Sequence, residues 1–309
     1  MIKTYKNFVI FFLIIIFILL FFLKKYNNII QQNQIDILVS NNVELIQSEI
    51  SNQKKYALSL AILFSKNQYI IDNLKNNNPK QLKDELNTLL ASISQYTKQQ
   101  NIQIQVHTKD LKVFVRSWED KDIGLNLSNF RKGLVKVKQS KQPFVSNELG
   151  KRFNIKAISP IFDKEKYIGS LEVIIDYSTI KERLQLAGID VIPLLDSKFL
   201  NIAKYHQNNK KLYNYVIIEE KYNENLYNIL LNNKDVLSQK QFYYQIDDTI
   251  ITFISLGSMD KETMGYLVAS FKNTNQNFNY LPNYEYKGII NTTIPLKETT
   301  QNKQNIIIK

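Results

Sequence analysis

The feature that most constrains this chain is an unbroken run of sixteen apolar residues at positions 8–23. As an α-helix at about 1.5 Å per residue, the run would span about 24 Å, slightly less than a hydrocarbon core of roughly 30 Å. Tyr5 and Tyr26 can extend the span into both interfaces. A cleaved signal peptide is the alternative, but no small-residue cleavage triplet follows the run. The run therefore predicts an uncleaved single-pass anchor over residues 1–27, with the long polar part of the chain outside the cytoplasm.

Cysteine content and charge narrow the function classes for the remaining chain. The 309 residues contain no cysteine, which excludes disulfides and thiol chemistry and suits an oxidising compartment. The net charge is +12, from 40 basic and 28 acidic residues, and the lysines are spread along the whole sequence. No nucleic-acid-binding motif accompanies them, so proximity to anionic lipid headgroups is the simpler explanation for the basic composition. We therefore expect a membrane as a partner and no nucleic acid.

Residues 28–99 have helical periodicity. No proline or glycine precedes Asn78, so the helix of the anchor can continue to about Leu74. Pro79 then begins a second helix after an asparagine-rich break. Apolar residues repeat at helical spacing along the first helix, at Ile46, Ile50, Ala57, Leu60 and Phe64. This stripe predicts contact with the lobes that follow and, as the natural dimer surface, a weak parallel homodimer.

From Ile102 the apolar period changes to two, which indicates strands. On the second of these strands Phe114, Arg116 and Trp118 are spaced two apart, so we expect them to share one face. Trp118 is the only tryptophan of the chain. An arginine between two aromatic side chains suits a site where a charged ligand group meets flat apolar walls, because a guanidinium can hold a carboxylate at two points. Packing of the arginine on the tryptophan alone is the alternative interpretation.

Three further polar residues are candidates for the same site. Residues 128–138 are predicted to form a short helix, and Arg131 in its first turn can share an anion with the helix amides. Glu148 can take the amine of an amino-acid ligand, or it can form an internal ion pair. His107 is interpreted first as a structural residue at a strand end and second as a hydrogen-bond donor in the pocket.

The order of these residues resembles a pattern found in the double Cache sensor domains of bacterial chemoreceptors and sensor kinases. The matching positions are His107, Asp110, Leu111, Phe114, Arg116 and Trp118, followed by Gly124, Leu127, Phe130 and Arg131. Asp110 stands one place earlier than in that pattern. The resemblance covers about residues 55–180 and is only architectural over 185–272. It implies a pocket in the first lobe for a small metabolite, such as a carboxylate or an amino acid. We predict as ligand-binding residues Arg116, Trp118, Arg131, Glu148, Phe114 and His107.

The strand pattern and the resemblance together predict an α+β chain. A transmembrane helix continues into a long helix, and two PAS-like lobes with antiparallel sheets follow. Residues 100–180 form the membrane-distal lobe, which ends in a hairpin of 155–161 and 167–175, and residues 185–272 form the membrane-proximal lobe. The strands predicted in the proximal lobe are 191–196, 199–203, 215–220, 242–246, 250–256 and 266–271, with a helix over 223–237. Residues 273–309 are predicted to be a polar tail.

We infer from these observations a sensor domain that binds a small metabolite for chemotaxis or signal transduction. It is expected in the inner (cytoplasmic) membrane, with its lobes in the periplasm. Two histidines, no cysteine and no nucleotide-binding glycine loop disfavour an enzyme, a metal site and a bound cofactor. A non-catalytic protein that uses the same fold to dock on a membrane partner, such as a separate signalling protein, is the main alternative. A truncated chemoreceptor is the third, because no second spanning segment or output domain follows the lobes.

Overall fold

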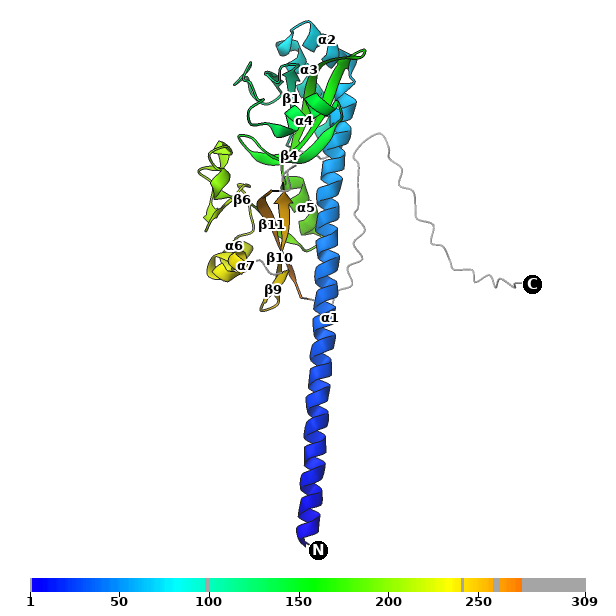
Figure 1. Ribbon diagram of the computed structural model, residues 1–309, viewed down its shortest axis with the longest axis vertical. Helices are drawn as coiled ribbons and strands as arrows, with labels where there is room; N and C mark the ends of the chain where they lie inside the picture. The colour runs from blue at the N-terminus through cyan, green and yellow to red at the C-terminus, as the bar shows by residue number, and fades with distance from the viewer. Residues whose placement is uncertain (1, 98–100, 240–241, 258–261, 274–309) are drawn as a thin grey trace, which may run out of the picture.

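The computed structural model describes residues 2–97, 101–239, 242–257 and 262–273. It has the predicted α+β class: one very long helix, α1 (Ile2–Ser65), carries two antiparallel sheets along its C-terminal half. Figure 1 shows the first lobe at the far end of α1, the second lobe beside its middle, and the N-terminal part of the helix projecting alone. The predicted polar tail lies outside the described residues from position 274 onward.

The projecting part of α1 coincides with the apolar run. The side chains of residues 11–23 have exposed fractions between 38 % and 73 %, although all are apolar. Among the described residues, α1 is the one helix that is long and apolar enough to cross a membrane. At about 1.5 Å per residue its 64 residues extend over roughly 95 Å. The same helix can therefore span a bilayer and still reach both lobes.

The long helix ends earlier than the sequence predicts. A continuous helix to about Leu74 is wrong, because a separate helix, α2 (Gln68–Lys75), begins after Asn67. The Asn67 side chain accepts hydrogen bonds from two backbone amides of the following turn, at 2.9 and 3.4 Å. An asparagine in this N-cap role satisfies amides that a helix start leaves free, so a new helix begins here without glycine or proline. The next helix, α3 (Pro79–Thr97), begins at its proline as predicted.

The first lobe contains a five-stranded antiparallel sheet in the order β2-β1-β5-β4-β3. Its strands are β1 (Ile102–Thr108), β2 (Val113–Arg116), β3 (Phe144–Leu149), β4 (Phe153–Asp163) and β5 (Lys166–Ile175). The predicted long hairpin is confirmed as β4 and β5, and β5 pairs on its other side with β1. α1 packs on one face of this hairpin, and α4 (Lys132–Ser140) packs on the other.

The second lobe contains a six-stranded antiparallel sheet in the order β7-β8-β6-β11-β10-β9. Its strands are β6 (Asp190–Asp196), β7 (Lys211–Leu212), β8 (Tyr215–Ile217), β9 (Tyr243–Ile246), β10 (Thr249–Gly257) and β11 (Thr263–Lys272). Three helices complete the lobe and its connection to the first: α5 (Ser178–Leu186), α6 (Glu224–Asn232) and α7 (Lys234–Gln239).

One strand predicted in the second lobe is wrong. Residues 199–203 follow a 3₁₀ turn, η1 (Ser197–Phe199), and precede another, η2 (Lys204–His206). The Asp196 side chain accepts a hydrogen bond from the backbone amide of Lys198 at 3.0 Å and starts the first turn. A capping aspartate competes with strand pairing by offering the backbone a local partner, so the chain turns where apolar alternation predicted a strand.

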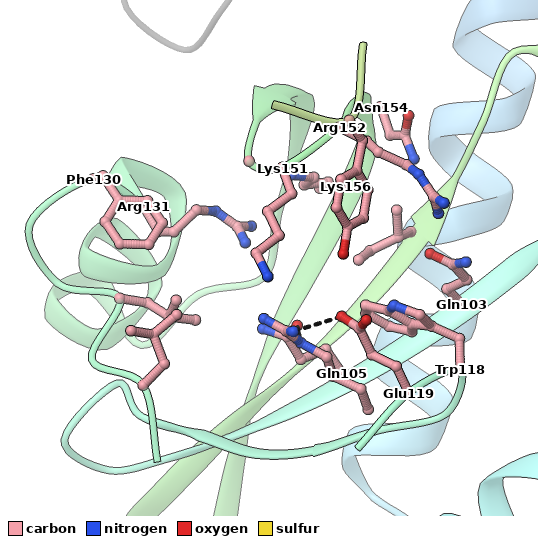
Figure 2. Close-up of a pocket in the computed structure, with 16 residues that line it drawn as sticks. Gln103, Gln105, Trp118, Glu119, Phe130, Arg131, Lys151, Arg152, Asn154 and Lys156 are labelled. Carbon is pink, nitrogen blue, oxygen red and sulfur yellow. Dashed lines mark hydrogen bonds and ion pairs between the residues drawn. The ribbon is translucent and has the colours of Figure 1, made fainter. Parts of the chain in front are cut away.

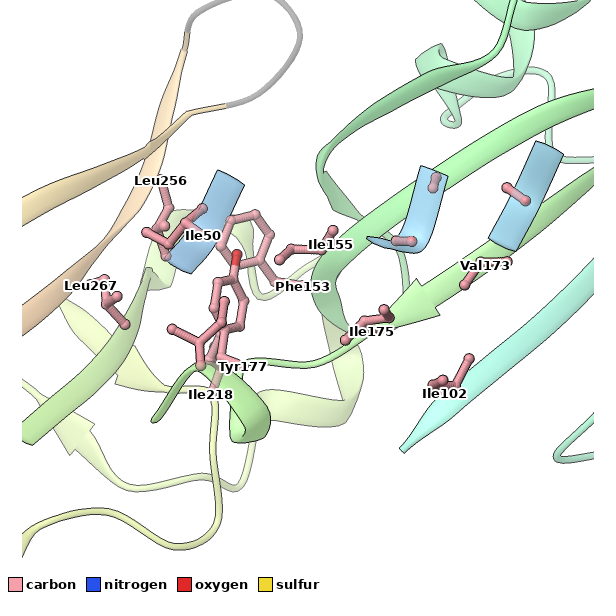
Figure 3. Close-up of a cluster of buried hydrophobic side chains, with 14 of the residues drawn as sticks. Ile50, Ile102, Phe153, Ile155, Val173, Ile175, Tyr177, Ile218, Leu256 and Leu267 are labelled. Atoms are coloured by element: carbon pink, nitrogen blue, oxygen red, sulfur yellow. The ribbon is translucent and has the colours of Figure 1, made fainter. Parts of the chain in front are cut away.

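One hydrophobic core joins the two sheets through α1. Ile50 of α1, Phe153 of β4 and Leu256 of β10 belong to the same buried cluster (Figure 3). Tyr177, which lies between the lobes in the chain, is fully buried in this cluster, and its hydroxyl donates to the Asn147 side chain at 3.1 Å. The lobes therefore share buried apolar surface and are not independent domains on a tether.

The apolar stripe predicted for a homodimer is part of this core. Ile46 and Ala57 are fully buried, Ile50 is 6 % exposed, and Leu60 and Phe64 pack against the same cluster. This corrects the expectation that the stripe is a dimer surface, because both sheets already cover it. A weak homodimer stays a prediction, but the buried stripe cannot be the surface through which it forms.

Removing the Ile46 side chain beyond Cβ tests the role of the stripe. We expect Ile46→Ala to lower the free energy of unfolding by about 2–4 kcal/mol, because it leaves a cavity in the core that both sheets share. Ile37→Ala is the matched control, since Ile37 lies on the same helix with 62 % of its side chain exposed. Thermal unfolding of the full chain in detergent measures both, and equal stabilities would show that α1 does not pack as described.

Candidate functional site

A cavity opens on the α4 face of the first sheet. The centre of a water-sized sphere can occupy a volume of about 80 Å³ inside the cavity. The total empty volume of the cavity, including its open mouth, is about 590 Å³. A single water needs about 10–15 Å³ on the first of these measures, so the cavity has the size for a small metabolite. Its charged and aromatic lining comes from both lobes and includes Arg116, Trp118, Glu119, Arg131, Lys151, Arg152, Lys156 and Tyr205.

The cavity wall is rich in positive charge. Figure 2 shows Arg131 and Lys151 extending their charged ends into a space that Gln103 and Trp118 border on the opposite side. Five of the lining residues are cationic and one, Glu119, is acidic. What the cavity can bind depends on which of these cations already form ion pairs with carboxylates of the protein.

Arg116 is held by protein carboxylates. Its side chain is 7 % exposed, and its Nη1 donates to Glu119 and Asp122, both at 2.7 Å. Its guanidinium carbon lies 5.6 Å from the centre of the Trp118 ring, and its Nε donates to Gln105 at 2.7 Å. The partners of Arg116 among the described residues are therefore carboxylates of the protein itself.

Phe114 does not share a face with Arg116. The register between β1 and β2 shifts, with Val106 opposite Val115 but His107 opposite Val113, so Phe114 is the extra residue of a bulge. Phe114 then joins Val115 in the hydrophobic core, whereas Arg116 lines the cavity. The expectation that alternation places Phe114 on the cavity wall is wrong, because a bulge adds one residue to the period of two.

Arg131 is the centre of a second buried ion-pair network. It caps the N-terminus of α4, which begins at Lys132 and not at Ser128 as predicted. Its guanidinium donates to Glu148 at 3.2 Å and makes a short contact with Glu172. Burial lowers the pKa of Arg131, but these two carboxylates outweigh it and raise the pKa above its ordinary value. Arg131 is therefore a permanent cation whose charge the protein already balances.

Glu148 lies behind Arg131 and does not line the cavity. Its carboxylate covers the first turn of α4, where a Cβ on Gly133 would lie 1.8 Å from Oε1. A carboxylate at a helix N-terminus is favourable, and glycine leaves the room for it. Of the two roles that the sequence leaves open for Glu148, the structure shows the internal ion pair.

His107 is fully buried and does not line the cavity. Because Arg116 can only donate, Gln105 accepts with its oxygen and turns its amide nitrogen toward His107 Nε2, at 2.6 Å. His107 Nε2 then has to accept, which leaves the ring proton on Nδ1 for the hydrogen bond to Ser170 at 3.2 Å. Burial lowers the pKa of His107 to about 4, although Glu172 opposes this shift. His107 is therefore neutral and orients the residues behind the cavity.

Lys156 is the site residue that sequence reasoning missed. It lies in the middle of β4, is 3 % exposed and lines the cavity. A Cβ on Gly150 would lie 2.6 Å from its Nζ, so the amine rests over a glycine of the cavity wall. Burial lowers the pKa of Lys156 to about 7, with a further lowering by Arg131. The sequence does contain a sign of this residue, because Lys156 is a charged residue between Ile155 and Ala157 in a strand that is mostly apolar.

The second lobe completes the cavity wall with Tyr205. Its backbone amide donates to the carbonyl of Lys151 at 3.0 Å. Its ring lies 5.0 Å from the guanidinium carbon of Arg152 and 5.6 Å from Lys151 Nζ. The next residue, His206, accepts a hydrogen bond from the backbone amide of Phe153 at 3.2 Å. The loop between β3 and β4 carries Lys151 and Arg152. The second lobe therefore holds this loop in place.

A wider cleft of about 840 Å³ adjoins the cavity between the lobes and has a different character. It shares Trp118, Arg152 and Tyr205 with the cavity but continues along Asp176 and Glu219. Burial, with a smaller contribution from Asp176, raises the pKa of Glu219 to about 7. The cleft is thus acidic where the cavity is basic, and the two differ in the ligands they favour.

Two antiparallel-sheet lobes on one long helix, with a cavity in the first lobe, define a double Cache sensor domain. The chain belongs to the family described as the double sensory domain of two-component sensor kinases, whose model matches residues 39–249, from α1 through the first lobe to the start of β10 in the second.

Among solved structures the chain is similar to the sensor domain of the histidine kinase DctB from V. cholerae, at 12% identity over 76% of this chain and 96% of that one, with a TM-score of 0.44. It is also similar to the ligand-binding domain of the Campylobacter jejuni chemoreceptor Tlp3 in complex with L-valine, at 14% identity over 79% and 96%, with a TM-score of 0.45. None of the curated proteins matches the chain.

The internal pairing of Arg116 generates a prediction. Arg116→Lys keeps the charge but cannot reach Gln105, Glu119 and Asp122 together, so we expect a loss of about 1–3 kcal/mol of unfolding free energy. Arg152→Lys is the matched control, because Arg152 is exposed and contacts no carboxylate among the described residues. Thermal unfolding of both variants measures the difference. An Arg116→Lys protein of unchanged stability would contradict the pairing seen here.

Proposed function

We propose that this protein is a membrane-anchored sensor domain whose membrane-distal lobe binds a small metabolite, a carboxylate or an amino acid, in the periplasm. The apolar end of α1 anchors it in the inner membrane. The bound state is passed to a chemotaxis or signal-transduction partner in the same membrane. The observation that carries the proposal is the cation-lined cavity in the first lobe of a double Cache fold.

The cavity has the features of a ligand site. It combines apolar and aromatic walls, from Leu125, Leu127 and Trp118, with a few convergent polar groups, which is the usual composition of small-molecule sites. The charged groups are fixed: the Arg116 and Arg131 networks hold their guanidinium groups through several hydrogen bonds each. A preorganised site of this kind loses little conformational entropy when a ligand binds.

The position of the anchor supports the orientation. Residues 11–23 project beyond both lobes on the same helix that is buried in the core they share. Exposed apolar side chains over more than three helical turns are unfavourable in water and favourable in a bilayer. A membrane at that end of α1 places the second lobe nearer the bilayer and the cavity farther from it.

Ligand binding is measured on the full chain in lipid nanodiscs. We expect at least one member of a panel of organic acids and amino acids to bind and to change the fluorescence of Trp118, the only tryptophan, because its ring lines the cavity. Gln103→Phe adds bulk at the cavity wall and should abolish the signal. Gln245→Phe is the matched control, at an exposed strand position of the other lobe.

A ligand that binds Gln103→Phe and the wild type equally would place the site elsewhere. Absence of binding across the whole panel would contradict the proposed function.

A further inference from the structure

Lys156 differs from the other cations of the cavity because it is both buried and without a partner among the described residues. Among the residues that the structure describes, neither a carboxylate nor a hydrogen-bond acceptor pairs with its Nζ. Arg116, Arg131 and Lys151, in contrast, all form ion pairs, and Arg152 is exposed. An unpaired ammonium that is only 3 % exposed is costly, because burial removes its hydration without replacing it.

The charges around Lys156 come from each element packed against it. They are Glu148 of β3, Glu172 of β5, Arg116 of β2 and Arg131 at the N-cap of α4, and His206 of η2 is a further titratable group beside them. Both carboxylates in this set already accept from Arg131. Those that hold Arg116 and Lys151, namely Glu119 and Asp122, are likewise engaged. The four carboxylates in and behind the wall thus hold Arg116, Arg131 and Lys151, and among the described residues none of them pairs with Lys156.

We propose that Lys156 binds a carboxylate group of the ligand, and that the ligand is an organic acid without a recognised ammonium group, not an amino acid. This deepens the proposed function and rests on it. The ligand carboxylate supplies the negative charge that Lys156 lacks as a partner. It also accepts a charge-assisted hydrogen bond from the buried ammonium.

The absence of an amine site follows from the same contacts. Glu119 is the one carboxylate among the described lining residues, and Arg116 already occupies it. Glu148, the residue expected to take a ligand amine, lies behind Arg131. An α-ammonium group in the cavity would be desolvated beside several cations with no free carboxylate, so an amino acid should bind less tightly than its deaminated counterpart.

Binding of an acid at Lys156 requires the charged form of the amine. Below a pH of about 7, the pKa of buried Lys156, the amine already carries its proton and the affinity should vary little with pH. Above that pH the free protein has to take up a proton on binding, so the affinity should fall by up to tenfold per pH unit. Glu219 also has a raised pKa of about 7, but it faces the adjoining cleft, so a substitution of Lys156 separates the two.

The test compares each acid with its amino acid and with the amine left when that amino acid loses its α-carboxylate. Isovalerate, valine and isobutylamine form one set, and succinate, aspartate and β-alanine form another. Titration calorimetry on the full chain in nanodiscs at pH 8, in phosphate and in Tris, measures affinity and the protons taken up. We expect the acid of at least one set to bind at least tenfold more tightly than its amino acid, with close to one proton taken up, and isobutylamine not to bind.

Lys156→Met removes the charge and keeps the length of the side chain. We expect it to weaken binding of the acid at least tenfold, to abolish the proton uptake, and to leave the melting temperature unchanged or higher, because no protein contact is lost. Lys55→Met on the exposed face of α1 is the matched control and should bind as the wild type does.

Three outcomes would overturn the inference. Tighter binding of amino acids than of their acids, or full affinity in Lys156→Met, would overturn it while the proposed function stands. Binding of no compound from either set, together with none from the wider metabolite panel, would overturn the proposed function as well.

Discussion

Burial of one face of α1 against both sheets is the contact on which the rest of the molecule depends. Polar contacts follow the same face: Asp36 accepts from Tyr243 of β9 at 2.9 Å, Glu49 from Arg183 of α5 at 3.1 Å, and the Ser65 hydroxyl meets Ser159 of β4 at 2.8 Å. The helix is thus fixed over about thirty residues, or on the order of 45 Å at 1.5 Å per residue. An isolated helix of this length gains little from propensity alone, so its geometry is set by the lobes that it joins.

The cavity follows a second constraint, the cost of burying charge. Guanidinium and carboxylate groups that leave water have to be paired, and the networks around Arg116 and Arg131 do so within the protein. Burial raises the pKa of Glu172, but the neighbouring cations outweigh it and hold this carboxyl below its ordinary range. These networks contribute rigidity, and within the described part of the chain they leave the buried ammonium of Lys156 without a protein partner.

Much of the fold could be predicted because the sequence encodes it locally. The change of apolar period at Ile102 predicts the first sheet, and the turn before Lys166 predicts its long hairpin. Three features escaped because they are not periodic. Asn67 starts a helix through its side chain, the bulge at Phe114 reverses which residues face the core, and Asp196 replaces strand pairing with a turn. Each depends on one residue, whereas apolar periodicity is read over many residues and does not detect it.

The sequence predicted part of the lining of the cavity, but it predicted the contacts of the individual residues less well. Arg116, Trp118 and Arg131 line the cavity, but Phe114, His107 and Glu148 lie in or behind its walls. Residue type alone could not separate an arginine that binds a ligand from one with internal partners. Only the fold shows that the loop after β2 brings Glu119 and Asp122 back to Arg116, and that Glu172 of β5 reaches Arg131. A lysine in the middle of an apolar strand is the stronger signal, since only an unusual environment tolerates it there.

The participation of Tyr205 gives the cavity a physical connection to the second lobe. Its amide holds the carbonyl of Lys151, and its ring contacts the arginine and lysine of the same loop. A ligand bound between Lys156 and Tyr205, as we propose, would contact both lobes and would therefore favour the arrangement in which this contact is formed over any in which it is open. By thermodynamic reciprocity, whatever stabilises the closed contact also tightens ligand binding. Because α1 is packed in the core of both lobes and continues into the apolar segment, a change in the angle between the lobes has to be accommodated along the same helix whose apolar end we propose as the membrane anchor.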